Sequence, residues 1–319
     1  MYSVAVVPIL VGAGAAYAAT GVMYFARCGQ LLLGSVLVVA WLNLSNDAFD
    51  AETGADVSKA ESVVALTGNR KAVLAAANVS LLGGVALLGR AVADSGDLRV
   101  GLVLAAAIFM GYLYQGPPFR LSYLGLGEPL CFLAFGPFAT CAFYLAQVAS
   151  GAPPGTTVLP MVSWPAMAAS VIVGTTTAAV LFCSHFHQVA SDRSAKKLSP
   201  VVRLGTDRAM QVLTGSVAWA VDLLMFGWRT HGDAAAVWPL KLYALSWHTA
   251  VGLALAAGLC LCRMPPPALP AFVLSARDQA VRLWQMNMRP LPKLPPPALA
   301  GPPAPQPPPP PPPPPLPAA

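Results

Sequence analysis

Eight stretches of almost continuously apolar residues constrain the fold of this chain more than any other feature. A helix needs roughly 20 apolar residues to cross a hydrocarbon core about 30 Å thick. The stretches are rich in Leu and Ala and lack the apolar–polar alternation of lipid-facing barrel strands. The sequence therefore predicts an all-α, multi-pass transmembrane helical bundle. The stretches lie near residues 2–25, 31–46, 72–93, 100–115, 128–149, 160–185, 209–228 and 241–262.

The composition excludes several other classes of protein. Of the 319 residues, 56% are hydrophobic and 10% are charged, which lies far from the composition of soluble domains. Five of the six cysteines fall in apolar stretches, where we interpret them as small buried hydrophobic side chains rather than a disulfide framework. The net charge is +6, but no basic cluster is interleaved with aromatic residues, so nucleic-acid binding is not expected.

The composition changes after Met264. We expect a transmembrane domain over residues 1–264, a short juxtamembrane segment over 265–289 and a proline-rich tail over 290–319. Proline lacks an amide donor and fixes φ, so the tail is expected to be extended polyproline II or disordered. Two interpretations of the tail stay open, a ligand for a profilin-like or SH3-like protein and a passive extension.

The basic residues are distributed unequally between the two sides of the predicted bundle. If successive helices alternate in direction, the loops after the second, fourth and sixth stretches share one face. By the positive-inside rule, the more basic face looks toward the cytoplasm, or toward the stroma in a plastid membrane. The shared loops hold Lys59, Arg70, Lys71, Arg120, Arg193, Lys196, Lys197, Arg203 and Arg208, whereas the other side holds Arg27, Arg90, Arg99, Arg229 and Lys241.

A cluster of acids and amides ends the second apolar stretch. On a helix, Asn43, Asp47 and Asp50 fall at i, i+4 and i+7, and Asn46 lies four residues before Asp50. Their oxygens then converge on one stripe, which suits Mg²⁺ bridged to phosphate oxygens. The alternative is a helix end whose polar residues meet water, although carboxylates at a helix C-terminus are opposed by its dipole.

A second polar cluster ends the sixth stretch. His185, Gln188 and Asp192 stand at i, i+3 and i+7, and Arg193 and the following lysines add positive charge. One carboxylate with several cations could hold a diphosphate through metal bridges and direct contacts. A solvated loop is the alternative.

His187 stands two residues after His185, and therefore on a different side of a helix. Joint metal ligation by the two imidazoles is not expected, and we favour a substrate-facing role for one of them over interior hydrogen bonding.

A third group of polar and aromatic residues follows the fourth stretch. Tyr114 precedes a Gly-Pro-Pro turn that ends the helix, and Arg120 and Tyr123 follow it. These side chains lie on the same face as the acidic clusters and could stack on or orient an aromatic acceptor. An interfacial aromatic belt is the alternative.

These motifs together resemble the UbiA superfamily of intramembrane prenyltransferases. The resemblance rests on Asn46-Asp47-x-x-Asp50, on a second Asp-containing motif four helices later, and on the Tyr-x-Gly-Pro-Pro turn. Five strings are similar to the plant and cyanobacterial dihydroxynaphthoate phytyltransferase branch, namely MYSV at 1–4, NLSND at 43–47, ESVV at 61–64, HFHQ at 185–188 and SPVVRLGT at 199–206.

The resemblance implies a bundle with a central prenyl-diphosphate cavity and a Mg²⁺-dependent reaction. Phytyl diphosphate would be ionised, and 1,4-dihydroxy-2-naphthoate prenylated with decarboxylation, in phylloquinone or menaquinone biosynthesis at a chloroplast membrane. The implied catalytic residues are Asp47, Asp50 and Asp192, with Asn46 as a further metal ligand. The implied diphosphate ligands are Asn43, Lys59, Arg193, Lys197 and Arg203, and the implied acceptor or prenyl contacts are Tyr114, Arg120, Tyr123, His185, His187 and Gln188.

The chain departs from the family pattern in several places. Gln188 and Ala190 stand where the superfamily has acids, which leaves Asp192, and Lys196 stands where a glycine is expected. The family has nine helices, of which we find about eight, and the first is expected to begin upstream of Met1. Other readings remain open, including a transferase with homogentisate or chlorophyllide as acceptor, and a catalytically silent membrane scaffold or carrier.

Overall fold

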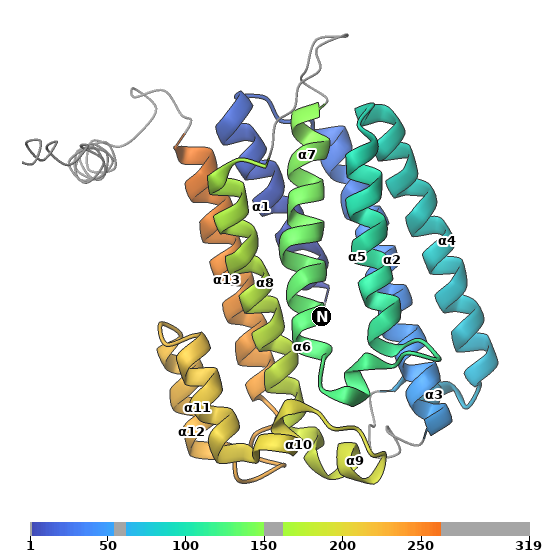
Figure 1. The fold of residues 1–319 in the computed structure, drawn as a ribbon, viewed down its shortest axis with the longest axis vertical. Coiled ribbons are helices and arrows are strands. Elements are labelled where there is room, and N and C mark those ends of the chain that lie inside the picture. Colours follow the sequence, from blue (N-terminus) through green and yellow to red (C-terminus); the bar gives the residue numbers. More distant parts are fainter. Residues whose placement is uncertain (1, 54–61, 150–161, 263–319) are drawn as a thin grey trace, which may run out of the picture. The chain divides into compact units, whose positions relative to one another are not determined.

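The computed structural model describes residues 2–53, 62–149 and 162–262, and this part of the chain is helical without strands. Seven of its helical segments are long and apolar enough to cross a membrane. The predicted all-α transmembrane bundle is thereby confirmed (Figure 1). The segments are α1 (Ser3–Thr20), α2 (Phe25–Thr53), α4 (Arg70–Ser95), α5 (Leu98–Gln115), the run of α6 (Gly127–Leu133), η2 (Ala134–Thr140) and α7 (Cys141–Ala149), then Trp164–Ser194, which begins with α8 (Trp164–His185), and α13 (Leu240–Leu261). The predicted segments after Met264 lie outside the described residues.

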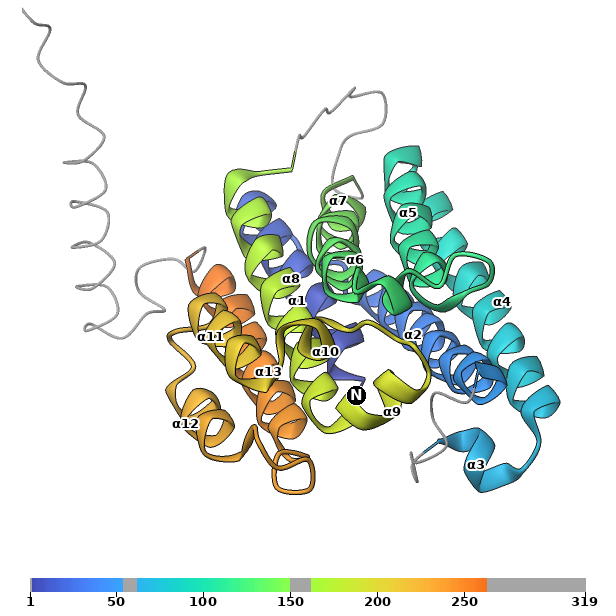
Figure 2. The same ribbon diagram turned by 60° about the horizontal axis from the view of Figure 1, so that its bottom comes forward.

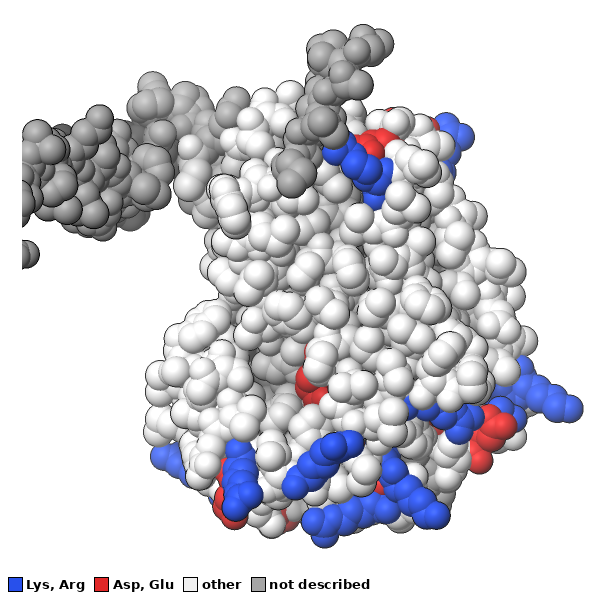
Figure 3. Space-filling view, in the orientation of Figure 1, with Lys and Arg blue, Asp and Glu red and all other residues white. Residues whose placement is uncertain are grey.

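Short helices gather at one end of the bundle. α3 (Val63–Thr67) follows α2, η1 (Leu121–Leu124) follows α5, and η3 (Phe186–Gln188), α9 (Val189–Ser194) and α10 (Pro200–Leu204) follow α8. Figures 1 and 2 show α3, α9 and α10 at this common end. Figure 3 shows most of the visible Lys and Arg side chains there and a smaller group at the opposite end. The three loops that hold the candidate motifs therefore share one charged end, as the alternation of helices predicts.

The predicted span over residues 209–228 is wrong. That region folds into two short helices, α11 (Thr206–Ser216) and α12 (Val221–Thr230), which lie side by side near α13 (Figures 1 and 2). Met210 lies against Gly227, where an added Cβ would meet the methionine Cε at 2.7 Å. The buried residues of both helices join one cluster with residues of α8 and α13. The apolar side chains of this region thus face protein on one side, and the pair turns back instead of crossing the bundle.

This reversal changes the position of two basic residues. Because α11 and α12 together return the chain to the charged end, α13 begins there, beside the end of α8 (Figure 1). Arg229 and Lys241 therefore belong to the charged end and not to the opposite one, which corrects the loop assignment made from eight spans. The correction strengthens the asymmetry of basic residues.

The helices that enclose the centre of the bundle contact one another closely at small residues. An added Cβ on Gly136 of η2 would lie 2.6 Å from the Ser170 carbonyl oxygen of α8. The η2 segment has π-helical hydrogen bonding around Pro137, which cannot donate an amide hydrogen. α2 and α4 form the most extensive helix pair, with Gly34 facing Gly84. These contacts fix the walls of the cavity described below.

We expect Gly84→Ala to destabilise the protein. The added methyl group would lie 2.9 Å from the Gly34 carbonyl oxygen, and overpacking of this kind costs about 1–3 kcal/mol. Gly89→Ala on the same helix is the matched control, because a Cβ there meets no atom within 4 Å. Thermal unfolding of both variants in detergent should show a lower midpoint for Gly84→Ala alone. Equal midpoints would contradict the close packing of α2 on α4.

Candidate active site

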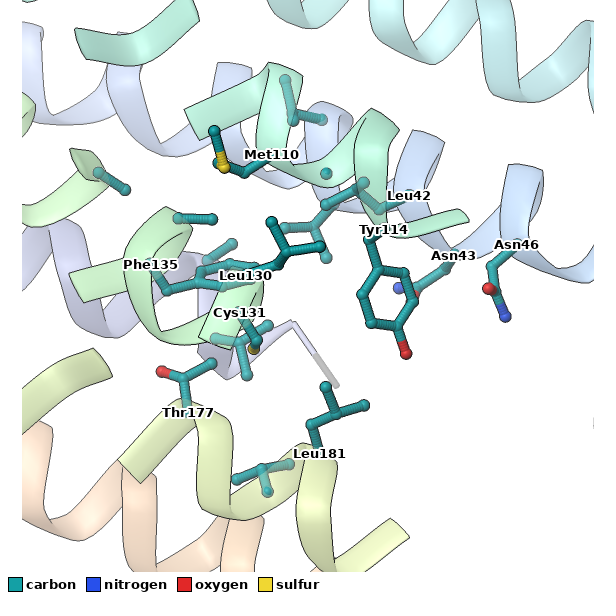
Figure 4. A pocket seen from close by; sticks show the side chains of 18 of the residues that line it. Leu42, Asn43, Asn46, Met110, Tyr114, Leu130, Cys131, Phe135, Thr177 and Leu181 are labelled. Atoms are coloured by element: carbon teal, nitrogen blue, oxygen red, sulfur yellow. The ribbon is translucent and has the colours of Figure 1, made fainter. Parts of the chain in front are cut away.

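A cavity of about 360 Å³ opens between α1, α2, α5, α6, η2, α8 and α13, with one lining residue each from α4 and α7. Its inner wall is apolar and includes Met110, Leu130 and Phe135, and its polar end includes Asn43 and Asn46. Figure 4 shows the two asparagines and the Tyr114 hydroxyl on one side of the cavity and these apolar side chains on the other. The cavity can therefore hold a long apolar chain with a polar group at the charged end.

Seven of the predicted site residues line this cavity. They come from α2, α5, the end of α8 and the loops that follow it, so residues distant in sequence converge as expected. The seven are Asn43, Asn46, Asp50, Tyr114, His185, Gln188 and Lys197. Lys59 lies outside the described residues.

The first acidic cluster lies on the last turns of α2, which continues to Thr53 instead of ending near residue 46. Asp50 is 3% exposed. Its Oδ2 accepts a hydrogen bond from Asn46 Nδ2 at 3.0 Å, and its Oδ1 accepts one from the Tyr123 hydroxyl at 2.8 Å. Two donors thus orient this buried carboxylate toward the polar end of the cavity.

Asp47 is also buried but is not among the cavity-lining residues. Its Oδ2 accepts a hydrogen bond from the Val63 amide at 2.9 Å. The carboxylate therefore attaches the beginning of α3 to α2. In this structure Asp47 and Asp50 face different surroundings, although they share a helix end.

The second motif extends from the end of a long helix through two short ones. α8 ends at His185, the 3-10 turn η3 follows, and α9 carries Asp192. Asp192 is 3% exposed. Its Oδ2 accepts a hydrogen bond from Ser199 Oγ at 2.8 Å, and its Oδ1 lies 3.8 Å from Lys197 Nζ. Because Lys197 lines the cavity, it extends this buried carboxylate–cation pair to the cavity surface.

The backbone conformation of Lys196 is one that glycine adopts more easily. Its φ of 56° lies in the left-handed region, which costs residues with a Cβ roughly 1–2 kcal/mol relative to the right-handed one. The loop keeps this conformation, and the neighbouring Lys197 amide donates to the Asp192 carbonyl oxygen at 2.8 Å. Lys196 therefore strains the loop, and the loop places Lys197 at the cavity.

The loop after α5 supports the site from outside the cavity. Tyr123 donates to Asp50 and also hydrogen bonds with Thr53 Oγ1 at 2.6 Å. Burial and the Asp50 carboxylate raise the pKa of Tyr123, so its hydroxyl stays protonated and can donate. Arg120 contacts Glu52 Oε2 at 3.3 Å. Neither Arg120 nor Tyr123 lines the cavity, so they hold the end of α2 in place.

Three further predicted residues do not line the cavity. Arg203 donates to the Leu198 carbonyl oxygen at 3.0 Å and to the Leu124 carbonyl oxygen at 2.7 Å, and so links two loops. Arg193 is exposed. His187 lies in η3, outside the set of lining residues that includes His185 and Gln188.

Two charged residues of this region were not predicted as site residues from the sequence. Lys241 lines the cavity from the first turn of α13, and its ammonium lies 4.9 Å from the ring centroid of Trp238. Its assignment to the opposite side of the bundle concealed it. Glu128 lies 2.9 Å from His185, and only the packing of α6 on α8 brings the two together. Glu128 follows the predicted group of Tyr114, Arg120 and Tyr123 in sequence, but no sequence signal paired it with His185.

Comparison with known proteins identifies the family of this chain. Residues 5–271 match the model of the UbiA prenyltransferase family. The chain belongs to this family. It is 44% identical over 291 residues to the 2-carboxy-1,4-naphthoquinone phytyltransferase, chloroplastic, of Arabidopsis thaliana, covering 82% of this chain and 75% of the relative.

Two other proteins extend this relationship. A 2-carboxy-1,4-naphthoquinone phytyltransferase of Synechocystis is 43% identical over 285 residues, covering 81% of this chain and 89% of the relative. A UbiA homolog from Archaeoglobus fulgidus, solved bound to GPP and Mg²⁺, has a TM-score of 0.54 at 16% identity, covering 81% of this chain and 95% of that one. The UbiA fold is thus shared, and the chain is an integral membrane prenyltransferase.

The carboxylate and amide oxygens of this site are donors of the kind that Mg²⁺ prefers. Within residues 2–53, 62–149 and 162–262, no group of three or more His, Cys, Asp or Glu side chains could hold a metal ion. Asp50 with Asn46 and Asp192 with Lys197 are instead two separate polar groups. Mg²⁺ commonly takes one or two carboxylates and completes its shell with phosphate oxygens and water. A ligand diphosphate can therefore complete such a site.

We expect Lys241→Met to weaken the binding of an anion in the cavity. Hydrogen bonds to charged groups contribute about 1.5–3 kcal/mol, so the dissociation constant should rise about tenfold or more. Radiolabelled inorganic diphosphate with Mg²⁺ in equilibrium dialysis is the probe. Lys71→Met is the control, since Lys71 is exposed on α4 and does not line the cavity. Unchanged binding in Lys241→Met, or equal losses in both variants, would contradict this placement.

Proposed function

We propose that the protein transfers a phytyl group from phytyl diphosphate to 1,4-dihydroxy-2-naphthoate, with loss of the carboxylate as CO₂, in phylloquinone biosynthesis. The observation that carries the proposal is the convergence of acidic, amide and basic side chains on one end of an apolar cavity. The names of two relatives at 43–44% identity support the phytyl donor and the bicyclic acceptor.

The polar end of the cavity suits the diphosphate of the donor. Asn46 and Asp50, together with Asp192, would hold Mg²⁺, which neutralises the leaving diphosphate when bound. Lys197 and Lys241 line the cavity and supply cations for the remaining phosphate oxygens. The UbiA neighbour bound to GPP and Mg²⁺ supports this cofactor. Asp47 is proposed as a further ligand if the Val63 amide releases it.

The apolar wall suits the isoprenoid chain and protects the reactive cation. Leu130 and Phe135 offer no nucleophilic atom to an allylic cation, and the apolar wall around them limits access of water to the bound chain. When the diphosphate leaves, the positive charge on the allyl group is attacked by the electron-rich acceptor ring. The new bond forms at the carbon that bears the carboxylate, and loss of CO₂ restores aromaticity.

The redox state of the acceptor follows from this chemistry. Attack on an allylic cation requires an electron-rich ring, which the dihydroxy form provides and the quinone does not. The quinone would also require two added electrons to yield the same product. We therefore propose that the reduced naphthoate is the form that reacts in the cavity.

The proposed location is a chloroplast membrane, either the envelope or the thylakoid. The name of the Arabidopsis relative includes the word chloroplastic. The charged end carries the polar half of the cavity together with most of the visible basic residues (Figure 3). By the positive-inside rule this end is proposed to look toward the stroma.

Product analysis tests the donor and the acceptor together. We expect purified protein given phytyl and octaprenyl diphosphates in equal amounts to form mainly the phytylated, decarboxylated naphthalenediol. Two mycobacterial relatives at 28–30% identity are named octaprenyltransferases, so the longer donor is the relevant competitor. Asp50→Asn should lower the rate by about 100-fold or more, whereas Asp94→Asn at the opposite end should not.

Two results would contradict the proposal. Prenylation of homogentisate or chlorophyllide without prenylation of the naphthoate would assign a different acceptor. No product from any acceptor, together with no Mg²⁺-dependent binding of a prenyl diphosphate analogue, would favour a scaffold or carrier.

A further inference from the structure

A buried acid–imidazole pair lies at the wall of the cavity and is not among the groups proposed above to bind the diphosphate. Glu128 Oε1 of α6 lies 2.9 Å from His185 Nδ1 at the end of α8, and their side chains are 13% and 3% exposed. Burying a carboxylate in an apolar bundle is costly unless a partner compensates it. Among the described residues, neither Glu128 oxygen accepts a hydrogen bond, and the basic nitrogen within ion-pair distance of the carboxylate is His185 Nδ1.

The order of the two residues relative to the cavity is informative. His185 lines the cavity, whereas Glu128 does not, although its neighbours Leu130 and Cys131 do. Glu128 therefore lies behind the imidazole. Because Nδ1 faces Glu128, the other ring nitrogen, Nε2, is left for a group on the cavity side. A carboxylate behind a histidine fixes the orientation of the ring and stabilises its protonated form.

An aromatic wall stands next to this pair. Tyr114 lies over Gly127, the residue before Glu128, where an added Cβ would be 2.9 Å from the tyrosine ring. Leu181, one turn before His185, also lies 3.6 Å from that Cβ position. Figure 4 shows Tyr114 and Leu181 projecting toward the same space. A flat aromatic ring held beside Tyr114 would thus lie near His185.

We propose that Glu128 and His185 act as a proton-holding dyad for the aromatic acceptor, with Glu128 as a positioning residue and His185 as the catalytic base. This inference rests on the proposed function. As the ring carbon bonds to the allylic cation, His185 Nε2 takes the proton of the adjacent hydroxyl group, and that oxygen becomes a carbonyl.

The second half of the step returns the proton. The carbon–carboxylate bond breaks, its electron pair re-forms the aromatic ring, and CO₂ leaves. The carbonyl oxygen then takes the proton back from His185. The ionised carboxylate supplies the electron pair, so the sequence consumes no net proton and needs no oxidant or reductant. The Glu128 carboxylate stabilises the imidazolium while His185 holds the proton.

Glu128→Gln and His185→Gln test this dyad. Each should lower kcat for naphthoate prenylation by about 100-fold, since general acid–base catalysis contributes 10²–10⁴-fold. The KM for the donor should stay within about twofold in Glu128→Gln, because Glu128 does not line the cavity and the diphosphate ligands are separate groups. Glu128→Asp should recover part of the loss. Asp207→Asn is the matched control, because Asp207 is 82% exposed and lies 3.7 Å from His231, away from the cavity.

A second acceptor separates a proton-transfer role from a structural one. A fluorinated 1,4-dihydroxy-2-naphthoate has a more acidic hydroxyl group and depends less on a base. With this acceptor, we expect the ratio of kcat between wild type and Glu128→Gln to be at least about fivefold smaller than with the natural acceptor. A more acidic hydroxyl group depends less on the strength of the base. A misfolded variant would show the same loss with both acceptors and weaker donor binding.

The outcomes distinguish this inference from the proposed function. Equal kcat in wild type and both glutamine variants would overturn the dyad and leave the phytyl transfer intact. A loss in Glu128→Gln that is the same for both acceptors would also overturn it. No naphthoate product from the wild-type protein would contradict the proposed function, and the dyad with it.

Discussion

The cost of burying a carboxylate among apolar helices determines where this protein can place its chemistry. Asp50, Asp192 and Glu128 are each largely buried at the charged end of the bundle, and each has polar contacts from another element. Tyr123 from the loop after α5 donates to the first, and Ser199 from the loop before α10 donates to the second. The acids therefore hold the loops in place, and the loops in turn orient the acids.

The rest of the fold follows from this arrangement. The long helices satisfy their own backbone hydrogen bonds, as a hydrocarbon environment requires, and close contacts at small residues such as Gly34 and Gly84 keep the cavity walls together. The short helices at one end can then carry polar side chains without breaking the apolar wall. The result separates an apolar chain site from a polar head-group site within one cavity.

Much of this could be predicted from local sequence, and the reason is visible in particular residues. Asn46 and Asp50 are four residues apart on one helix, so helical geometry places their side chains together, with Asn46 Nδ2 3.0 Å from Asp50 Oδ2. The glycine that the family resemblance led us to expect at position 196 also fits a local backbone requirement, because Lys196 has a φ of 56°. The apolar stretch over 209–228 was predicted as a span because its length and composition suit one. Its helix ends at Ser216, and the two resulting short helices pack against α8 and α13.

Other features depend on tertiary structure and had no local signal. The Glu128–His185 contact arises only when α6 packs on α8, and Lys241 reaches the cavity only because α11 and α12 turn back. Conversely, Arg203 fits a diphosphate ligand by its sequence position, but its guanidinium donates to the Leu198 and Leu124 carbonyl oxygens. Charge and spacing indicate which residues are near a site, but packing decides which of them face it.

The Asp50 and Asp192 groups are proposed to form one site that a diphosphate joins. The most direct measurement is the Mg²⁺-dependent affinity of a non-hydrolysable phytyl diphosphate analogue for wild type, Asp50→Asn, Asp192→Asn and the double variant. We expect each single change to weaken binding at least about tenfold, and the double change to cost less than the sum by about 1 kcal/mol or more. Strictly additive losses, or wild-type affinity in Asp192→Asn, would contradict a single site.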